Sequence, residues 1–308
     1  MQLGVRAYRG EEDYWRIRAF LREVFQCNGR RERSWSVVRF DYWRWHGVEN
    51  IEHHRLEEVI FIWENWDGRI AAVLNPEGAG EAFFQVHPNF RTPALEEEML
   101  TVAELMLATP APGGGRQLRV WANEQDGQRQ AMLRRRGYSK GEWPEYQRRR
   151  SLSGPVADAL PAAGYSVRAL GDVDELPARS LVSWRVFHAD EPDSRYEGWA
   201  WYHNVQRAPL YRRDLDLVAV APDGELASFC TVWFDDVTRT GVFEPVGTAP
   251  AHQRRGLGRA VMCEGLRRLQ RLGATMATVG SYSEAAGALY AAVGFTEYDL
   301  LERWSKHF

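Results

Sequence analysis

One short stretch of the chain combines glutamine, glycine and arginine in a pattern that suits a phosphate group. Gln253, Gly256 and Gly258 lie between a run typical of a β-strand and a run typical of a helix. A helix N-terminus presents unpaired N–H groups and the positive end of the helix dipole, which favours anions. Glycine lets a pyrophosphate reach the backbone. Positive charge around the loop would come from Arg254, Arg255 and Arg259.

The elements that would position this loop alternate between strand and helix. We expect a strand at Val242–Thr248, a helix at Gly256–Leu272, a strand at Thr275–Gly280 and a helix at Glu284–Ala292. A hairpin through Asp223-Gly224 precedes them. Strands that alternate with helices around a hairpin predict an α/β fold with a mixed sheet flanked by helices. Further expected elements of this half are strands at 166–169, 215–220, 226–234 and 296–303, and helices at 175–187 and 197–205.

The first half of the chain repeats this order. Val5-Arg6-Ala7 recurs as Val167-Arg168-Ala169, an offset of 162, and each copy precedes an acidic helix start. The alternative is chance among common residues. We expect two domains joined near 150–164, where Ser, Gly, Pro and Ala dominate. Expected elements of the first half are strands at 4–8, 58–66, 69–74, 82–86 and 117–121, and helices at 11–25, 37–45, 95–107 and 128–135.

The motifs of the second half resemble those of the GNAT superfamily of acyl-coenzyme A-dependent N-acyltransferases. Gln253-x-x-Gly256-x-Gly258 is similar to the pyrophosphate signature of the family. Ala286-x-x-Leu289-Tyr290, followed by Gly294-Phe295, is similar to its second signature. The resemblance is strong over about Leu215–Tyr298, and two copies in one chain resemble the tandem GNAT enzymes. It implies two tandem GNAT-like domains, with acetyl-coenzyme A as the cosubstrate and without a metal.

The resemblance also implies a role for individual residues. Glu244 would take the proton of the amine, and Tyr290 would protonate the departing thiolate. The pantetheine arm would bind the backbone of Val246, Gly247 and Thr248, one of whose N–H groups could stabilise the oxyanion. The pyrophosphate would bind Gln253, Arg254, Arg255, Gly256, Leu257, Gly258 and Arg259. Ser283 stands where the family often has Asn, which puts that cofactor contact in doubt.

Each of these residues also has a structural interpretation. Glu244 could be a solvated or ion-paired strand residue, and Tyr290 could fill a helix core. The glycine loop could be an ordinary turn. Cys263 is expected to be buried, and His252 is expected at the surface. Arg148-Arg149-Arg150 is interpreted as an exposed strand end and not as a nucleic-acid patch.

The first half has lost every chemical group of this pattern. With the offset of 162, Ala82 replaces Glu244, and Ala94 and Glu96 replace Gly256 and Gly258; with an offset of 157, Leu133 replaces Tyr290. Glu96-Glu97-Glu98 would place negative charge where a pyrophosphate would bind. We therefore expect residues 1–152 to form a degenerate GNAT-like domain without a coenzyme A site, and residues 164–308 to form the catalytic domain.

Aromatic and acidic residues ahead of the hairpin are candidates for binding a cationic acceptor. Such groups attract an amine, although a place in the core is the commoner fate of aromatic residues at helical spacing. The candidates are Trp184, His188, Asp190, Glu191, Asp193, Trp199 and Tyr202, with Asp235 and Asp236 at a turn.

Composition limits the classes of protein that the chain can be. With 308 residues and 44% hydrophobic residues, it is long enough for two folded cores. We expect no membrane span, because 18 consecutive apolar residues occur nowhere, and no secretion signal at the N-terminus. Three cysteines are too few for a disulfide framework or a zinc site, which favours the cytoplasm. A net charge of −3 argues against nucleic-acid binding.

Three functions remain open at this point. The first is an acetyl-coenzyme A-dependent N-acetyltransferase that acts on an amine, with a small molecule favoured over a protein as acceptor. Direct transfer in a ternary complex is expected, because no activated Cys or Ser is evident. The second is a non-catalytic protein that binds or senses acyl-coenzyme A. The third is an aminoacyl-tRNA-dependent transferase, which the net charge and the intact pyrophosphate loop disfavour.

Overall fold

The computed structural model describes residues 3–308. The chain folds into two compact units, Met1–Tyr146 with Asp299–Phe308, and Gln147–Tyr298. The last ten residues of the chain therefore belong to the first unit, although the sequence places them at the end of the second half. The strand expected at 296–303 is β14 (Glu297–His307), and all but its first two residues lie in the first unit.

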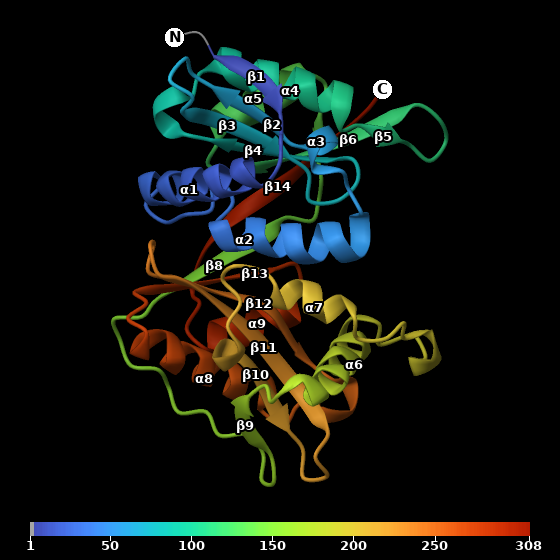
Figure 1. Cartoon of the computed structure of the whole chain (residues 1–308), viewed down its shortest axis with the longest axis vertical. Coiled ribbons are helices and arrows are strands. Elements are labelled where there is room, and N and C mark those ends of the chain that lie inside the picture. Colours follow the sequence, from blue (N-terminus) through green and yellow to red (C-terminus); the bar gives the residue numbers. More distant parts are fainter. Residues whose placement is uncertain (1–2) are drawn as a thin grey trace. The chain divides into compact units, whose positions relative to one another are not determined.

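The first unit is a mixed sheet with helices (Figure 1). Its strand order is β1-β2-β3-β4-β6-β14, antiparallel apart from the parallel pair β4–β6. The strands are β1 (Gly4–Ala7), β2 (Phe61–Glu64), β3 (Ile70–Asn75), β4 (Glu81–Val86), β5 (Thr109–Pro110), β6 (Arg116–Asn123) and β7 (Ser139–Lys140). The helices are α1 (Glu11–Cys27), α2 (Val37–Tyr42), the π-helix η1 (Trp43–Glu52), α3 (Leu56–Val59), the 3₁₀ turn η2 (Pro88–Phe90), α4 (Pro93–Met106) and α5 (Gly127–Arg135).

The second unit has the same kind of architecture (Figure 1). Its strand order is β8-β13-β12-β11-β10-β9, in which β12 and β13 are parallel and β9 to β12 are antiparallel neighbours. The strands are β8 (Glu145–Ser151), β9 (Ser166–Ala169), β10 (Asp216–Val220), β11 (Leu226–Asp235), β12 (Thr240–Thr248) and β13 (Met276–Ser281). The helices are α6 (Leu176–Phe187), α7 (Trp201–Gln206), α8 (Leu257–Arg271) and α9 (Glu284–Ala292), with short turns η3 (Val173–Glu175), η4 (Asp193–Arg195), η5 (Arg213–Leu215) and η6 (Pro250–His252). The mixed α/β fold is thus as predicted.

The repeated sequence motif makes the same contacts in both units. Nη1 of Arg6 donates to the carbonyl of Ala7 at 3.0 Å, and Nη1 of Arg168 donates to the carbonyl of Ala169 at 3.0 Å. Each arginine also pairs with a carboxylate seven residues further along, Asp13 and Glu175. The first strand of each unit is therefore fixed to the following helical segment in the same way.

Three expected elements differ from those observed. The strand expected at 58–66 begins later, because Leu56–Val59 forms the short helix α3. The helix expected at 197–205 begins only at Trp201, because Gly198 has a φ of +100°, which a right-handed helix does not allow. The helix expected at 37–45 changes at Trp43 into a π-helix that continues to Glu52.

Two glycines bring α8 close to the sheet of the second unit. A Cβ at Gly265 would lie 2.9 Å from side-chain atoms of Phe243 and Val232, and a Cβ at Gly241 would clash with the side chain of Leu269. Phe243, Val232 and Leu269 are buried in the core of this unit. The close approach fixes the helix along the sheet, with its first residue, Leu257, also buried in that core.

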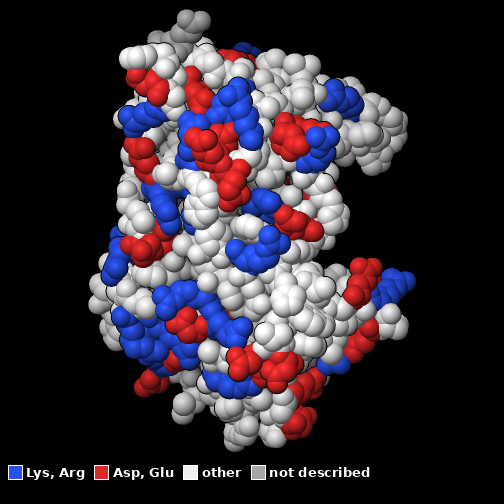
Figure 2. All heavy atoms as spheres, in the orientation of Figure 1, with Lys and Arg blue, Asp and Glu red and all other residues white. Residues whose placement is uncertain are grey.

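Charged side chains of both signs are interspersed on the face shown in Figure 2. Within residues 3–308, no helix combines the length and hydropathy that crossing a bilayer requires. In the same range, His, Cys, Asp and Glu side chains form no group of three that could hold a metal ion. All three cysteines have free thiols, Cys27 exposed and the other two buried.

Candidate active site

The two parallel strands of the second unit separate towards their carboxyl ends. β12 and β13 pair from Thr240 opposite Met276 to Val242 opposite Thr278, and there the pairing ends. β12 continues to Thr248 and β13 to Ser281. The edge of β12 beyond Val242 thus offers backbone N–H and C=O groups towards β13. An extended ligand could pair with them as another strand would.

A bulge in β12 stands at the same place. Cys230 of β11 is opposite Val246, whereas Val232 is opposite Phe243, so that Glu244 and Pro245 together face the single residue Thr231. Nε1 of Trp233 donates to the carbonyl of Glu244 at 2.6 Å and fixes this segment. Bulges bend a strand and redirect its side chains. The local distortion therefore sets the direction of the Glu244 side chain.

Glu244 and Tyr290 lie close enough to influence one another. Tyr290 is 7% exposed, and its ring contacts that of Phe295 edge-to-face at 6.4 Å. Burial raises the pKa of Tyr290 well above its ordinary value, and the negative charge of Glu244 raises it further. The hydroxyl of Tyr290 therefore stays protonated across the physiological pH range and can donate a hydrogen bond.

The loop after β12 leads directly into α8. Gly256 is the residue before the helix, with a φ of +73°, and Arg254 has a φ of +62°. The left-handed conformation suits glycine. Glycine has no side chain that could cap the helix, so the first N–H groups of α8 are left for another acceptor. Nε2 of Gln253 donates to the carbonyl of Thr248 at 3.4 Å and connects the loop to β12.

Gly258 stands where α8, α9 and β12 converge. A Cβ at this position would lie 3.2 Å from Cδ2 of Leu289 and 3.4 Å from Oγ1 of Thr248. A larger side chain would have to point away from these neighbours, into the region in front of the helix N-terminus. The second glycine of the sequence motif therefore keeps that region open.

The remaining residues predicted to bind the cofactor divide into two groups. The side chains of the first group are at least partly accessible: Arg254, Arg255 and Arg259 are exposed, and Val246 and Thr248 are partly buried. The hydroxyl of Thr248 lies 2.9 Å from that of Ser228. The three residues of the second group have a structural role. Gly247 leaves room for Phe229 and Val186, the side chain of Leu257 is buried, and the hydroxyl of Ser283 accepts the N–H of Ala286 at 3.3 Å as the cap of α9.

Comparison with known proteins identifies this unit. Residues 178–295 match the model of the acetyltransferase (GNAT) family. The second unit is therefore a GNAT acetyltransferase domain. The matched residues begin in α6 and end just after α9, so they include every residue predicted for the site.

Two curated relatives of this GNAT chain are mycothiol acetyltransferases. The protein from Kineococcus radiotolerans is 29% identical over 240 residues, which are 74% of this chain and 74% of the relative. The protein from Paenarthrobacter aurescens is 26% identical over 263 residues, which are 77% of this chain and 73% of the relative.

Solved structures share the fold along the whole chain. A GCN5-related N-acetyltransferase from Sphaerobacter thermophilus has a TM-score of 0.66 at 18% identity, over 99% of this chain and 95% of that chain. A tandem GNAT protein from the clavulanic acid biosynthesis pathway has a TM-score of 0.68 at 14% identity, over 99% and 98%. The likeness therefore includes both units and concerns the fold.

The segment between β8 and β9 contacts the loop that joins β12 to α8. The composition of 150–164 predicts only a linker, so this contact was not expected from the sequence. The N–H of Ala162 donates to the carbonyl of Arg255 at 3.1 Å, and the carbonyl of Leu160 would lie 3.7 Å from a Cβ at Gly256. The hydroxyl of Tyr165 is hydrogen-bonded to Nδ1 of His252 at 2.9 Å. His252, expected at the surface, is thus part of the contact between this segment and the loop.

Several residues considered for the acceptor have partners within the fold. Tyr202 is buried and donates to Asp216, and the buried Asp235 accepts the hydroxyl of Thr238 at 2.7 Å. These two residues stabilise the unit. Asp193 pairs with Arg185 at 2.7 Å and Glu191 with Arg195 at 3.2 Å, whereas the ring of Trp184 stacks on His188 at 3.8 Å.

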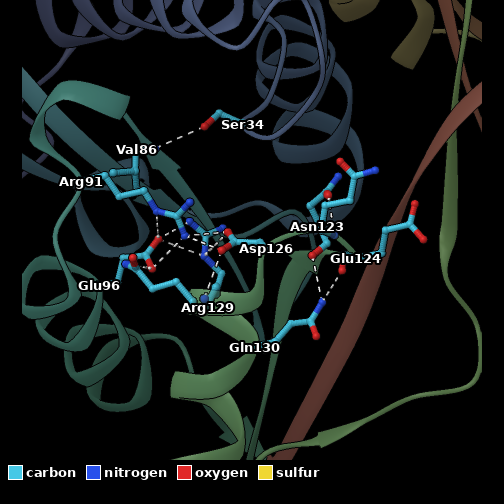
Figure 3. A network of polar contacts seen from close by, with 11 residues as sticks. Ser34, Val86, Arg91, Glu96, Asn123, Glu124, Asp126, Arg129 and Gln130 are labelled. Carbon is cyan, nitrogen blue, oxygen red and sulfur yellow. Dashed lines mark hydrogen bonds and ion pairs between the residues drawn. The ribbon is translucent and has the colours of Figure 1, made fainter.

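The corresponding helix start in the first unit is occupied by its own side chains. Thr92 caps α4 by accepting the N–H of Leu95 at 3.2 Å. Glu96 is fully buried and pairs with Arg91 at 3.1 Å and with Arg129 at 2.6 Å, and Arg91 reaches Asp126 at 2.6 Å. Figure 3 shows these four side chains pointing towards one another. The arginines hold the pKa of Glu96 below its ordinary value in spite of burial.

This arrangement corrects two steps of the sequence analysis. The residues before α4 and α8 are Thr92 and Gly256, so Ala94, and not Glu96, corresponds to Gly258. The negative charge expected at this helix start is also reduced, because two of the three glutamates are paired with arginines. Glu96 is neutralised by two arginines, and Glu97 by Arg135 and Arg136.

Proposed function

We propose that the second unit transfers an acetyl group from acetyl-coenzyme A to the amine of a small molecule, directly and within a ternary complex. One observation carries this proposal. The open edge of β12 leads to the glycine start of α8, and Glu244 of that strand is near enough to Tyr290 for its charge to affect the pKa of the tyrosine. The site would thus combine a track for an extended chain, a place for a diphosphate, a base and a hydroxyl.

The cosubstrate would bind along this track. The pyrophosphate would accept the first N–H groups of α8, from Leu257 to Arg259, where the helix dipole favours an anion. Gln253 and the exposed Arg254, Arg255 and Arg259 would surround it. The pantetheine arm would lie along the open edge of Val246, Gly247 and Thr248, and Ser283 would lie at the start of α9 beside it.

The reaction would follow from the positions of these groups. The amine attacks the thioester carbonyl while Glu244 takes its proton. A backbone N–H of the open β12 edge donates to the oxyanion. Direct transfer is favoured over an acyl-enzyme because burial raises the pKa of both cysteine thiols in this unit, Cys230 and Cys263, so that neither is an activated nucleophile.

We propose that the first unit, which contains most of residues 1–152, is a degenerate GNAT-like domain without a coenzyme A site. Its helix start has a capping threonine and a buried ion-pair network where the second unit has glycine and exposed arginine. The free thiols favour a reducing compartment, and we propose the cytoplasm. The names of the two curated relatives support a small molecule as acceptor.

A turnover screen tests the proposal. The full chain is incubated with acetyl-coenzyme A and a panel of small-molecule amines, and release of free thiol is followed. We expect acceptor-dependent release with at least one amine, and release that is at least about a hundredfold slower with the Glu244→Gln variant. Binding of coenzyme A without turnover on any amine would favour a sensing protein instead. Absence of binding would exclude both functions.

A further inference from the structure

An arginine of β8 sits on the first turn of α9. β8 lies beside β13 in the sheet of the second unit. Nη2 of Arg148 would lie 2.9 Å from a Cβ at Gly287, and its Nε donates to the hydroxyl of Ser281 at 3.4 Å. The guanidinium lies 5.1 Å from the centre of the Tyr298 ring. Gly287 thus provides the space that lets this cation approach the helix, and the expectation of an exposed strand end is wrong for Arg148, which is partly buried.

This position brings the cation close to Tyr290. Gly287 and Tyr290 are three residues apart in α9, so they lie on the same face of the helix, with Cβ positions about 5–6 Å apart. The positive charge of Arg148 lowers the pKa of Tyr290 and opposes the effects of burial and of Glu244. Arg148 of β8 and Glu244 of β12 therefore have opposite effects on the pKa of the tyrosine hydroxyl.

A proton from Tyr290 is not enough to stabilise the thiolate that leaves at this place. An ordinary thiol has a pKa of about 8.5 and an ordinary tyrosine of about 10, so a tyrosine is already the weaker acid. Burial raises the pKa of Tyr290 further. In place of the full proton transfer that the resemblance implies, we therefore assign this hydroxyl a hydrogen bond to the sulfur. The sulfur then leaves as an anion and needs a positive charge nearby.

The charges that face Tyr290 come from three strands. Glu244 of β12 is negative, Arg148 of β8 is positive, and Cys230 of β11 is neutral because burial raises its pKa. Among these three groups, only the arginine can stabilise an anion. Glu244 itself becomes neutral when it takes the proton of the amine, so it no longer repels the thiolate as the thiolate departs.

We propose that Arg148 stabilises the coenzyme A thiolate released beside Tyr290. The proposal rests on the proposed function. The amine nitrogen forms a bond with the acetyl carbon and gives its proton to Glu244. The carbon–sulfur bond breaks, and its electron pair goes to sulfur. The thiolate accepts a hydrogen bond from Tyr290 and interacts with the charge of Arg148. Glu244 then releases its proton to solvent.

The test measures the ionisation of the bound thiol without any acceptor. Coenzyme A is bound to the full chain, and thiolate absorbance in the ultraviolet is followed against pH. A parallel complex with desulfo-coenzyme A serves as the blank and removes the contribution of protein tyrosines. An opposite charge nearby lowers an acid pKa by about 1–3 units. We expect the thiol pKa in the wild-type complex to be lower than in free coenzyme A by an amount in this range.

Variants of two arginines separate the charge from the packing. We expect Arg148→Met to raise the thiol pKa from the wild-type value towards that of free coenzyme A, and Arg148→Lys to keep most of the shift. The matched control is Arg150→Met. Arg150 lies on the same strand, and its Nη1 would lie 2.9 Å from a Cβ at Gly294, beyond the other end of α9. Its replacement should leave the thiol pKa unchanged.

The outcomes distinguish this proposal from the one on which it rests. If the wild-type chain does not bind coenzyme A, both proposals fail. If it binds but the thiol pKa equals that of free coenzyme A, or is the same in wild type and Arg148→Met, only the role of Arg148 is overturned. Should Arg148→Met fail to fold, Arg148→Gln, which also removes the charge, takes its place in the comparison.

Discussion

At the scale of single residues, the carboxylate of Glu244 is the group that we propose as the base. Its strand is bulged at this position, and its carbonyl is held by Trp233. Replacement by glutamine keeps the shape and removes the basicity. We expect Glu244→Gln to lower kcat by about 10²–10⁴-fold, with the dissociation constant of coenzyme A unchanged. Steady-state kinetics and calorimetry measure the two quantities.

Glu297→Gln is the matched control for this prediction. Glu297 is an exposed carboxylate of the same unit that pairs with Arg149 at 3.1 Å. Its replacement should leave turnover unchanged. Full activity of Glu244→Gln at neutral pH would show that another group removes the proton.

The hydroxyl of Tyr290 leads to a prediction about pH. Because its pKa is raised above the ordinary value of about 10, the hydroxyl stays protonated at pH 10. Ionisation of Tyr290 should therefore cause no loss of activity between neutral pH and pH 10. We expect Tyr290→Phe to lower kcat by about tenfold or more with an alkaline profile of the same shape as that of wild type. A wild-type rate for this variant would limit Tyr290 to packing against Phe295.

At the scale of elements, the start of α8 is where the two units should differ in coenzyme A binding. A glutamate at Gly258 would have to avoid Leu289 and Thr248, and its charge would lie in front of the helix N-terminus. We expect Gly258→Glu to weaken coenzyme A binding at least about a hundredfold, or about 2.7 kcal/mol, while the chain still folds. Calorimetry measures the affinity, and circular dichroism checks the fold.

The first unit offers a matched control for this variant. Ala94 is the exposed residue of α4 that corresponds to Gly258. Ala94→Glu places the same charge at the equivalent helix start, and coenzyme A affinity should stay at the wild-type value. Equal losses in both variants would mean that the assignment of the site to the second unit is wrong.

The buried network at α4 leads to a prediction about stability. Glu96→Gln removes one of the two carboxylates shared by Arg91 and Arg129, which both keep Asp126. Breaking a buried ion pair outright costs about 3–5 kcal/mol, so we expect a loss below this range. The pKa of Glu96 is lowered in the folded chain, so its contribution is present above the unfolded value of 4.5 and is lost as pH falls through the folded value. Denaturant unfolding should show a lower stability at pH 7 and a smaller loss on acidification below pH 4.5 than in wild type. An unchanged unfolding free energy would contradict this.

Some features of the elements could be predicted from the sequence and others could not. The glycine spacing and the strand–loop–helix order around Gly256 are local features, and the structure has them as predicted. The bulge at Glu244 depends on how β12 pairs with β11, and Gly198 shortens α7 through its backbone conformation. Neither can be read from hydrophobic periodicity. Arg148 was missed because its role depends on which strand lies beside β13.

At the scale of the whole molecule, the two halves of the sequence do not coincide with the two folded units. β14 completes the sheet of the first unit by pairing with β6, and β8 belongs mainly to the second unit. Pairing between segments so far apart along the chain leaves no local signal, so the sequence placed the boundary by composition alone. Each unit therefore needs a strand from the other half, and neither half is expected to fold as a separate fragment.

The number of coenzyme A molecules per chain tests the account of both units together. The second unit has a glycine start of α8 beside an open strand edge, and the first unit has a threonine cap and a closed set of ion pairs at the same position. Binding in the first unit would require the network of Arg91, Glu96 and Arg129 to open and two buried charges to lose their partners. Calorimetric titration of the full chain should therefore give one site. A stoichiometry of two would show that the first unit is not degenerate, and a stoichiometry of zero would remove the cosubstrate from the proposed function.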